Sequence, residues 1–89
     1  MSHQVIQFHL IFSSKVQQQL EELSPQDQKQ YLKAFQILTE SGPAYRSLRT
    51  HRYRYKGGEI WGSSASMAKR FFWQYAEDRT ILITSLDSH

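Results

Sequence analysis

The chain has 89 residues, enough for one small domain near the size where burial on folding only just outweighs the entropy of ordering the chain. It contains no cysteine, which excludes a disulfide framework and a thiolate metal site and favours a reducing, cytoplasmic setting. No apolar run approaches the roughly 20 residues that cross a bilayer, and the first residues lack the basic segment of a signal peptide. We therefore expect no membrane partner.

The charge is unevenly distributed along the sequence. The net charge is +3, but residues 1–43 carry three lysines against four acids, whereas residues 44–89 carry eight lysines or arginines against four acids. Between residues 46 and 56 there are five cations and no acid. This asymmetry favours a polyanionic partner over an acidic small molecule.

The first elements expected are a strand and a short helix. Residues 5–12 alternate between two sets of side chains and are rich in strand-forming residues, the pattern of a half-buried strand. Ser14, with Gln17 three residues later, has the spacing of a capping box and predicts a short helix over residues 14–23.

A second helix is expected to begin at Ser24 and Pro25, because serine caps a helix and proline is tolerated in its first turn. Gly42-Pro43 is expected to end it. Its apolar stripe consists of Tyr31, Ala34, Phe35 and Leu38, widened by Leu32 and Ile37.

The second half predicts strands in succession at residues 48–55, 59–65, 69–76 and 80–86. Gly57-Gly58 suits a tight hairpin turn that needs positive φ. There are no repeats or linkers. The sequence therefore predicts one α+β domain over residues 1–89, in which a helical hairpin packs on one face of a small, mainly antiparallel sheet.

The segment from Arg46 to Lys56 mixes cations with tyrosines and a histidine. Cations neutralise phosphates, and tyrosine rings stack on unpaired bases, so the segment is a candidate surface for binding nucleic acid. The alternative is a solvated edge strand whose charges discourage aggregation. Five cations without an acid exceed what edge protection needs, which favours binding of nucleic acid.

Arg70 begins an aromatic strand in which alternation puts Phe71, Trp73 and Tyr75 on one face. If that face covers the helices, Arg70 points to the open face, where a guanidinium suits a phosphate that gains charge in a transition state. The alternative is an arginine that bridges to Glu59 or to an exposed main-chain carbonyl.

Two histidines are candidates for proton transfer. His51 lies inside the cationic segment, where neighbouring positive charge favours the neutral ring, which can accept a proton. His89 is the last residue, for which a frayed end is the default interpretation. No pair of histidines has metal-ligand spacing with a third ligand nearby, so no metal or other cofactor is expected.

Taken together, the chain resembles the RelE/ParE superfamily of toxins from type II toxin–antitoxin systems, in its RelE/YafQ-like mRNA interferase branch. The stretch SSKVQQQLEELSPQDQKQYLKAFQIL is similar to the family's helical hairpin. The stretch LRTHRYRYKGGEIWGSSASMAKRFFWQY is similar to its centre, with a leu-x-x-his element, a gly-x-x-trp turn and an arginine that opens an aromatic strand. The closing ILITSLDSH resembles a last strand that ends in a small residue and histidine. The resemblance covers nearly the whole chain and implies the order β-α-α-β-β-β.

The resemblance implies a metal-independent endoribonuclease that enters the ribosomal A site and cuts mRNA by attack of the 2′-hydroxyl on the adjacent phosphate. In this mechanism Arg70 stabilises the phosphorane, His51 binds RNA or acts as base, and His89 is the general acid. The phosphates of mRNA and ribosomal RNA are held by Arg49, Arg52, Arg54 and Lys56. The implied partners are mRNA, the ribosome and a cognate antitoxin that wraps the toxin, with DNA reached only indirectly through an antitoxin complex.

Two departures from the family keep alternatives open. Many relatives continue for a few residues past the position of His89, and Ser63, Ser64 and Ser66 stand where some branches carry further His, Asp or Arg. The alternatives are a non-catalytic ParE-type toxin that inhibits DNA gyrase, and a degenerate member that acts only as a binding module. The basic, histidine-bearing segment favours the nuclease.

Overall fold

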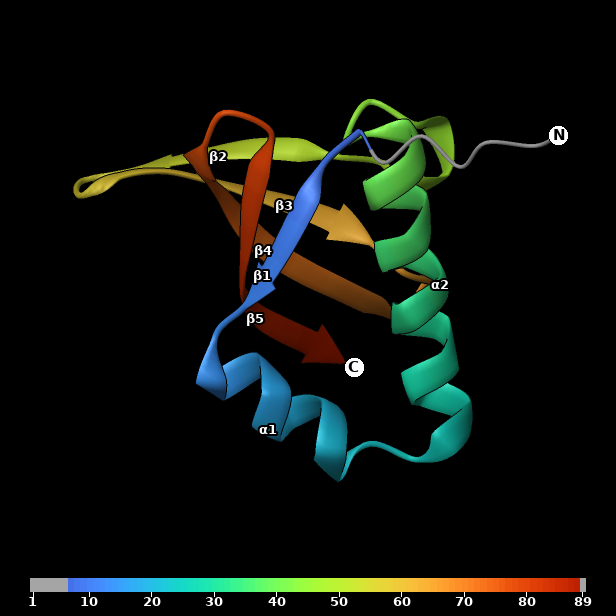
Figure 1. The fold of residues 1–89 in the computed structure, drawn as a ribbon. Helices are drawn as coiled ribbons and strands as arrows, with labels where there is room; N and C mark the ends of the chain where they lie inside the picture. The colour runs from blue at the N-terminus through green and yellow to red at the C-terminus, as the bar shows by residue number, and fades with distance from the viewer. Residues whose placement is uncertain (1–6, 89) are drawn as a thin grey trace, which may run out of the picture.

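The structure is a computed structural model, in which residues 7–88 are described. Two helices pack against a five-stranded sheet of strand order β1-β5-β4-β3-β2 (Figure 1). The elements are β1 (His9–Phe12), α1 (Ser14–Glu22), α2 (Pro25–Ser41), the 3-10 helix η1 (Arg46–Leu48), β2 (His51–Tyr55), β3 (Gly58–Ser64), β4 (Lys69–Glu77) and β5 (Thr80–Ser88). The α+β class is confirmed.

The sheet is mixed but mostly antiparallel. Strands β2 to β5 form an antiparallel meander, and β1 pairs in parallel with β5. Four strands follow the helices, one more than the β-α-α-β-β-β order has. Among the described residues, no helix has the length and apolar character needed to cross a membrane.

Both helices begin at serine caps. The Ser13 side chain accepts a hydrogen bond from the Val16 N–H at 3.2 Å, so the predicted cap at Ser14 is wrong by one residue. The Gln17 side chain donates instead to the Phe12 carbonyl at 3.1 Å. Ser24 caps α2 as predicted. The helix ends at Gly42, whose φ of 86° is easily adopted only by glycine.

The core lies between the helices and one face of the sheet. Phe35 of α2 contacts the rings of Phe12 and Phe71 at centroid distances of 5.1 and 5.0 Å. Leu32 is 55% exposed, so its predicted place in the apolar stripe is wrong, because it points about 100° away from Tyr31 around the helix. The buried residues from the helices are Val16, Tyr31, Ala34, Phe35 and Leu38, and those from β4 and β5 are Phe71, Trp73, Ile81, Ile83 and Leu86.

Helix α1 covers the part of β5 that extends past β1. The Gln19 side-chain amide donates to the Leu86 carbonyl at 3.1 Å and accepts from the Leu86 N–H at 2.9 Å. These two bonds replace the strand neighbour that β5 lacks there. The end of β5 is thereby held beside β4, instead of being left as an open edge.

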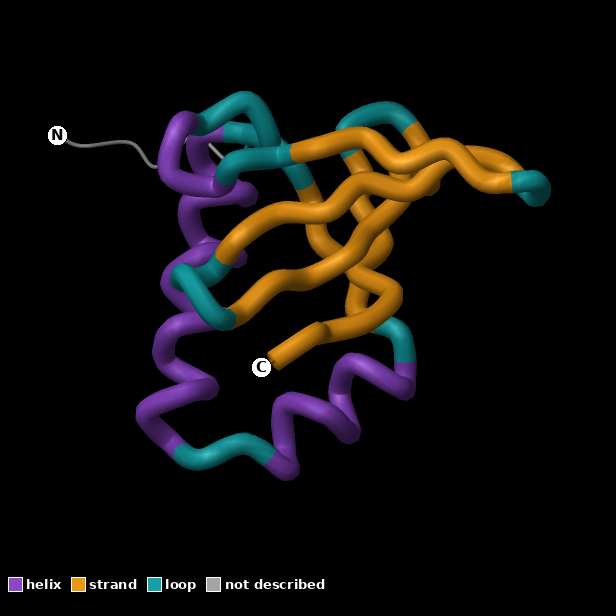
Figure 2. The backbone as a smooth tube through the Cα atoms, turned by 180° about the vertical axis from the view of Figure 1, so that it is seen from behind, coloured by secondary structure: helices purple, strands orange, loops and turns teal. Residues whose placement is uncertain are grey.

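The β2–β3 hairpin projects away from the helices, as both views show (Figures 1 and 2). The predicted strand over residues 48–55 begins only at His51, because Leu48 is buried in η1 and Arg49 has left-handed φ of 45°. Tyr55 pairs with Gly58, so the loop is Lys56-Gly57, one residue before the predicted turn, and Gly58 supplies the positive φ.

Candidate functional site: a cationic cleft on the open face

The strand register sorts the side chains of the hairpin and β4 onto two faces. Directly opposite residues of antiparallel strands share a face. Phe71 and Trp73 of β4 are buried against the helices, so Arg70 and Phe72 point to the open face, as predicted. Across β3, Gly62 pairs with both Phe72 and His51, which brings His51 to this open face.

A cleft of about 420 Å³ lies on the open face, where β2 begins and β3 turns into β4. Two of its lining side chains are arginines and none is acidic, a composition that attracts anions. It brings together three predicted site residues from two separate segments: Arg49 and His51 from one, and Arg70 from the other. We call it the open-face cleft; it is lined by Ser47, Arg49, His51, Ser64, Ser66, Met67 and Arg70.

The Arg70 guanidinium is held by a tyrosine of the hairpin. Its Nη2 donates to the Tyr53 hydroxyl at 3.0 Å. The alternative in which Arg70 bridges to Glu59 is wrong, because Glu59 lies on the other face. There its carboxylate lies 3.9 Å from Arg52 and 3.5 Å from Arg54.

Gly62 makes room for this contact. A Cβ at Gly62 would lie 2.9 Å from Cε2 of Tyr53 and 3.0 Å from Cε1 of Phe72. Without it, the two rings meet over β3 at a centroid distance of 6.2 Å. Because Gly62 has no side chain, the Tyr53 ring can lie over β3 and reach Arg70.

The backbone of Arg70 is tied to the core. The fully buried Tyr31 of α2 directs its hydroxyl at the carbonyls of Arg70 and Asp87, at 3.2 and 3.1 Å. Arg70 and Asp87 are opposite each other in the β4–β5 ladder. Helix α2 thus fixes both strands at the edge of the open-face cleft.

A chain of hydrogen bonds fixes the segment that carries Arg49 and His51. The Thr50 hydroxyl donates to the Pro43 carbonyl at 2.7 Å, so Ser63 donates to Thr50 in their 2.7 Å contact. The Trp73 indole N–H donates to Ser63 at 2.9 Å. Ser63 is completely buried, and this chain fastens the start of β2 to β3 and β4.

Three other predicted residues, Arg52, Arg54 and Lys56, lie away from the open-face cleft. Arg52 and Arg54 are on the helix-side face of the hairpin, and Lys56 is in its exposed loop. His89 lies outside the described residues. The roles predicted for these four side chains stay predictions. Within residues 7–88, no group of three or more His, Asp or Glu side chains could hold a metal ion.

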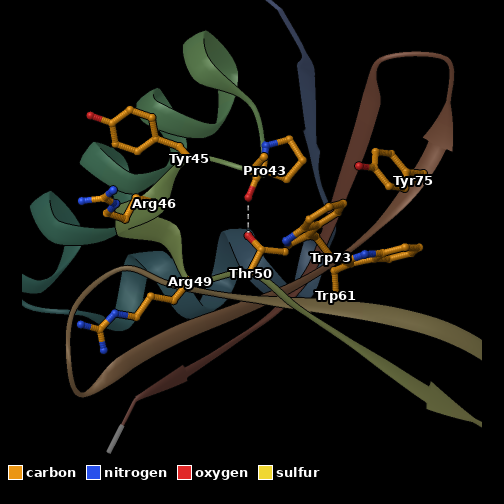
Figure 3. A pocket seen from close by; sticks show the side chains of 9 residues that line it. Pro43, Tyr45, Arg46, Arg49, Thr50, Trp61, Trp73 and Tyr75 are labelled. Carbon is orange, nitrogen blue, oxygen red and sulfur yellow. Dashed lines mark hydrogen bonds between the residues drawn. The ribbon is translucent and has the colours of Figure 1, made fainter.

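A second cleft, of about 410 Å³, lies on the helix-side face between the end of α2 and the sheet (Figure 3). Trp61 stacks on Trp73 at 5.4 Å, and Tyr75 meets both indoles edge-on at 5.0 Å. Partial burial raises the pKa of the Tyr75 hydroxyl above its ordinary value of 10.0. We call this second cleft the aromatic cleft. It is lined by Pro43, Ala44, Tyr45, Arg46, Arg49, Thr50, Trp61, Trp73 and Tyr75.

Sequence reasoning missed the contact of Tyr53 with Arg70 and the aromatic cleft. A signal for Tyr53 was present, because it alternates with His51 and so shares its face. The aromatic cleft had no such signal, since it forms only where η1 folds back beside Trp61 and Trp73.

No family model matches the sequence, and no curated protein matches it either. The structure, however, is similar to solved toxin structures. The RelE–RelB complex of the archaeon Pyrococcus horikoshii gives a TM-score of 0.76 at 14% identity, over 93% of this chain and 96% of that chain. The YoeB/ParE toxin of Agrobacterium tumefaciens gives 0.73 at 8% identity, over 92% and 99%. The toxin–antitoxin complex RelBE2 of Mycobacterium tuberculosis gives 0.66 at 15% identity, over 94% and 100%. The chain has the fold of the RelE/ParE superfamily of toxins.

Proposed function

We propose that this protein is the toxin of a type II toxin–antitoxin system and that its open-face cleft cleaves ribosome-bound mRNA without a metal. The observation that carries the proposal is the convergence of Arg49, His51 and Arg70 in one cleft that has no acidic lining residue. A polyanion is the substrate that such a cleft attracts.

In the proposed reaction, the 2′-hydroxyl of a nucleotide attacks its own 3′-phosphate. The O2′–P bond forms and the P–O5′ bond breaks, which leaves a 2′,3′-cyclic phosphate and a 5′-hydroxyl end. His51 accepts the 2′-hydroxyl proton, and Arg70 stabilises the charge that grows on the phosphorane. His89 gives a proton to the leaving 5′-oxygen.

The proposed partners are a cognate antitoxin and the translating ribosome in the cytoplasm. Two proteins with the same fold are found in complexes named RelE–RelB and toxin–antitoxin complex RelBE2. An antitoxin that neutralises this chain has to cover the open-face cleft or alter it.

Induced expression in bacteria tests the function. Growth is followed while the 5′ ends of transcripts are mapped, for the wild type and for Arg70→Ala, His51→Ala and His89→Ala. We expect growth arrest with cuts confined to translated mRNA, and loss of both in Arg70→Ala. Lys29→Ala, a change of an exposed cation on α2, is the matched control and keeps full activity.

Three outcomes would contradict the proposal. Arrest without cuts, together with inhibited supercoiling by the purified protein, points to a gyrase inhibitor. Unchanged cutting in the Arg70→Ala and His89→Ala double variant removes the catalytic assignment. A cleavage rate that stays flat between about pH 5.5 and 8.5 argues against histidines as acid and base.

A further inference from the structure

The aromatic cleft has two chemically different ends. Trp61 and Tyr75 form one end, and Tyr75 is 47% exposed. Figure 3 shows the Arg46 and Arg49 side chains on the opposite side, with Pro43 and Thr50 between the two ends. Flat aromatic surface and positive charge are thus separated across one cavity.

The two arginines are available to a ligand. No ion pair within 4.0 Å involves Arg46 or Arg49 among residues 7–88, whereas Arg52 and Arg54 already face Glu59. Both arginines, with Tyr45 and Ser47, also line an adjoining cavity of about 510 Å³. The cationic end therefore opens into further space, where a charged group can extend.

A nucleotide has the matching chemistry, because it joins a flat base to an anionic phosphate. Any base can stack on a tryptophan or tyrosine ring, because every base has a flat π-face, and guanidinium groups bind phosphate. A cavity of about 410 Å³ is within the usual range for small-ligand sites. The pre-formed Trp61–Trp73 stack means that little ordering is needed when the base enters.

We propose that the aromatic cleft is a nucleotide-binding subsite, in which an unpaired base stacks on Trp61 and contacts Tyr75 edge-on while Arg46 and Arg49 bind its phosphate. Arg49 lines this cleft and the open-face cleft alike. A strand bound in the open-face cleft can continue past Arg49 to the opposite face of the sheet. Only this continuous path rests on the proposed function; the affinity of the subsite for a nucleotide does not.

Tryptophan fluorescence tests the subsite directly, because the chain's two tryptophans both line it. The probe is adenosine 5′-monophosphate, with adenosine and inorganic phosphate as its two halves. We expect saturable quenching by the monophosphate. The affinities for adenosine and for phosphate should each be at least about fivefold lower. Matching shifts of the two indole N–H signals in NMR spectra provide a second readout.

Single substitutions separate the two ends of the subsite. Tyr75→Leu and Arg46→Gln should each lower the affinity for the monophosphate at least about fivefold. This is the low end of the effect of losing one contact between a base and an aromatic ring. Arg46 is exposed, so Arg46→Gln does not disturb packing, and thermal unfolding verifies that Tyr75→Leu is folded. Lys29→Gln is the charge-matched control and leaves binding unchanged.

Further measurements distinguish failure of the nucleotide-binding subsite from failure of the proposed function. Arg70→Ala should keep the fluorescence response while it loses cleavage. A short DNA strand, which lacks the attacking 2′-hydroxyl, should bind more tightly than the monophosphate if the path is continuous; equal affinity overturns the path. Non-saturating quenching, equal affinity for adenosine and its monophosphate, or saturable binding of a synthetic acidic peptide in place of the nucleotide overturns the subsite.

Discussion

At the scale of single residues, the site depends on how one guanidinium is held. Arg70 is part-exposed, and a long exposed side chain samples many rotamers unless something restrains it. Its hydrogen-bond partner is a neutral hydroxyl, from Tyr53, and Asp87 lies opposite it in the β4–β5 ladder. We interpret Tyr53 as a positioning residue that limits the directions in which Arg70 points.

Tyr53→Phe tests this interpretation. It removes only the hydroxyl, and we expect kcat for RNA cleavage to fall about tenfold, or ~1.4 kcal/mol, with little change in KM. Tyr55→Phe is the matched control, because the Tyr55 hydroxyl contacts Gln74 and not Arg70. Equal effects of the two substitutions would mean that Tyr53 only supports the hairpin. Gly62→Ala should mimic Tyr53→Phe, since the new methyl group displaces the Tyr53 ring.

Much of this residue-scale picture can be predicted from alternation. The face of the sheet to which Arg70 points follows from the aromatic pattern of its strand. The face to which His51 points follows from the alternating pattern of residues 51–55. The distance from Tyr53 to Arg70 cannot be predicted in this way, because it depends on two registers across β3. One register is set by the loop at Lys56-Gly57, and the other by the irregular turn after Ser64.

At the scale of elements, the segment between α2 and β2 determines where β2 starts and thereby the positions of Arg49 and His51 in the open-face cleft. Its alternating pattern predicts a strand from Leu48, but burial of Leu48 in η1 and the left-handed Arg49 break the strand. Alternation alone could not show this, because a single buried leucine fits either structure. The hydrogen-bond chain through Ser63 holds the resulting loop against the sheet.

Ser63→Ala should therefore destabilise the protein. It leaves the buried Trp73 indole N–H without its acceptor, which costs about 1–3 kcal/mol. Urea unfolding measures the loss, and Ser64→Ala, on the open face, should change stability by less than about 0.5 kcal/mol. An unchanged unfolding midpoint in Ser63→Ala would show that another acceptor replaces the serine.

At the scale of the whole molecule, the cationic segment is not one surface. Five cations in eleven residues suggest a single patch, yet the strand sends His51 to one face and Arg52 and Arg54 to the other. The β2–β3 hairpin extends beyond the body of the molecule (Figures 1 and 2). Glu59 reduces the net charge of its helix-side face.

Glu59→Gln should therefore strengthen RNA binding. It leaves Arg52 and Arg54 without their carboxylate, and we expect affinity to rise about two- to fivefold at low salt, with the gain lost at high salt. Exposed ion pairs contribute little to stability, so unfolding should hardly change. Filter binding across a salt series measures the effect, and Glu77→Gln, an exposed acid at the end of β4, is the control. A gain of equal size in the control would make the effect one of net charge alone.

The parallel pairing of β1 with β5 has a consequence for synthesis. Strand β5 lies inside the sheet, between β1 and β4, so β1 cannot pair until β5, which is made long after it, is available. A nascent chain that has not yet released residues 80–88 from the exit tunnel cannot complete its sheet, and Tyr31 has no β5 carbonyl to bind. Non-local pairing of this kind is slow to form. The order of translation itself therefore delays assembly of the sheet until residues 80–88 have left the exit tunnel.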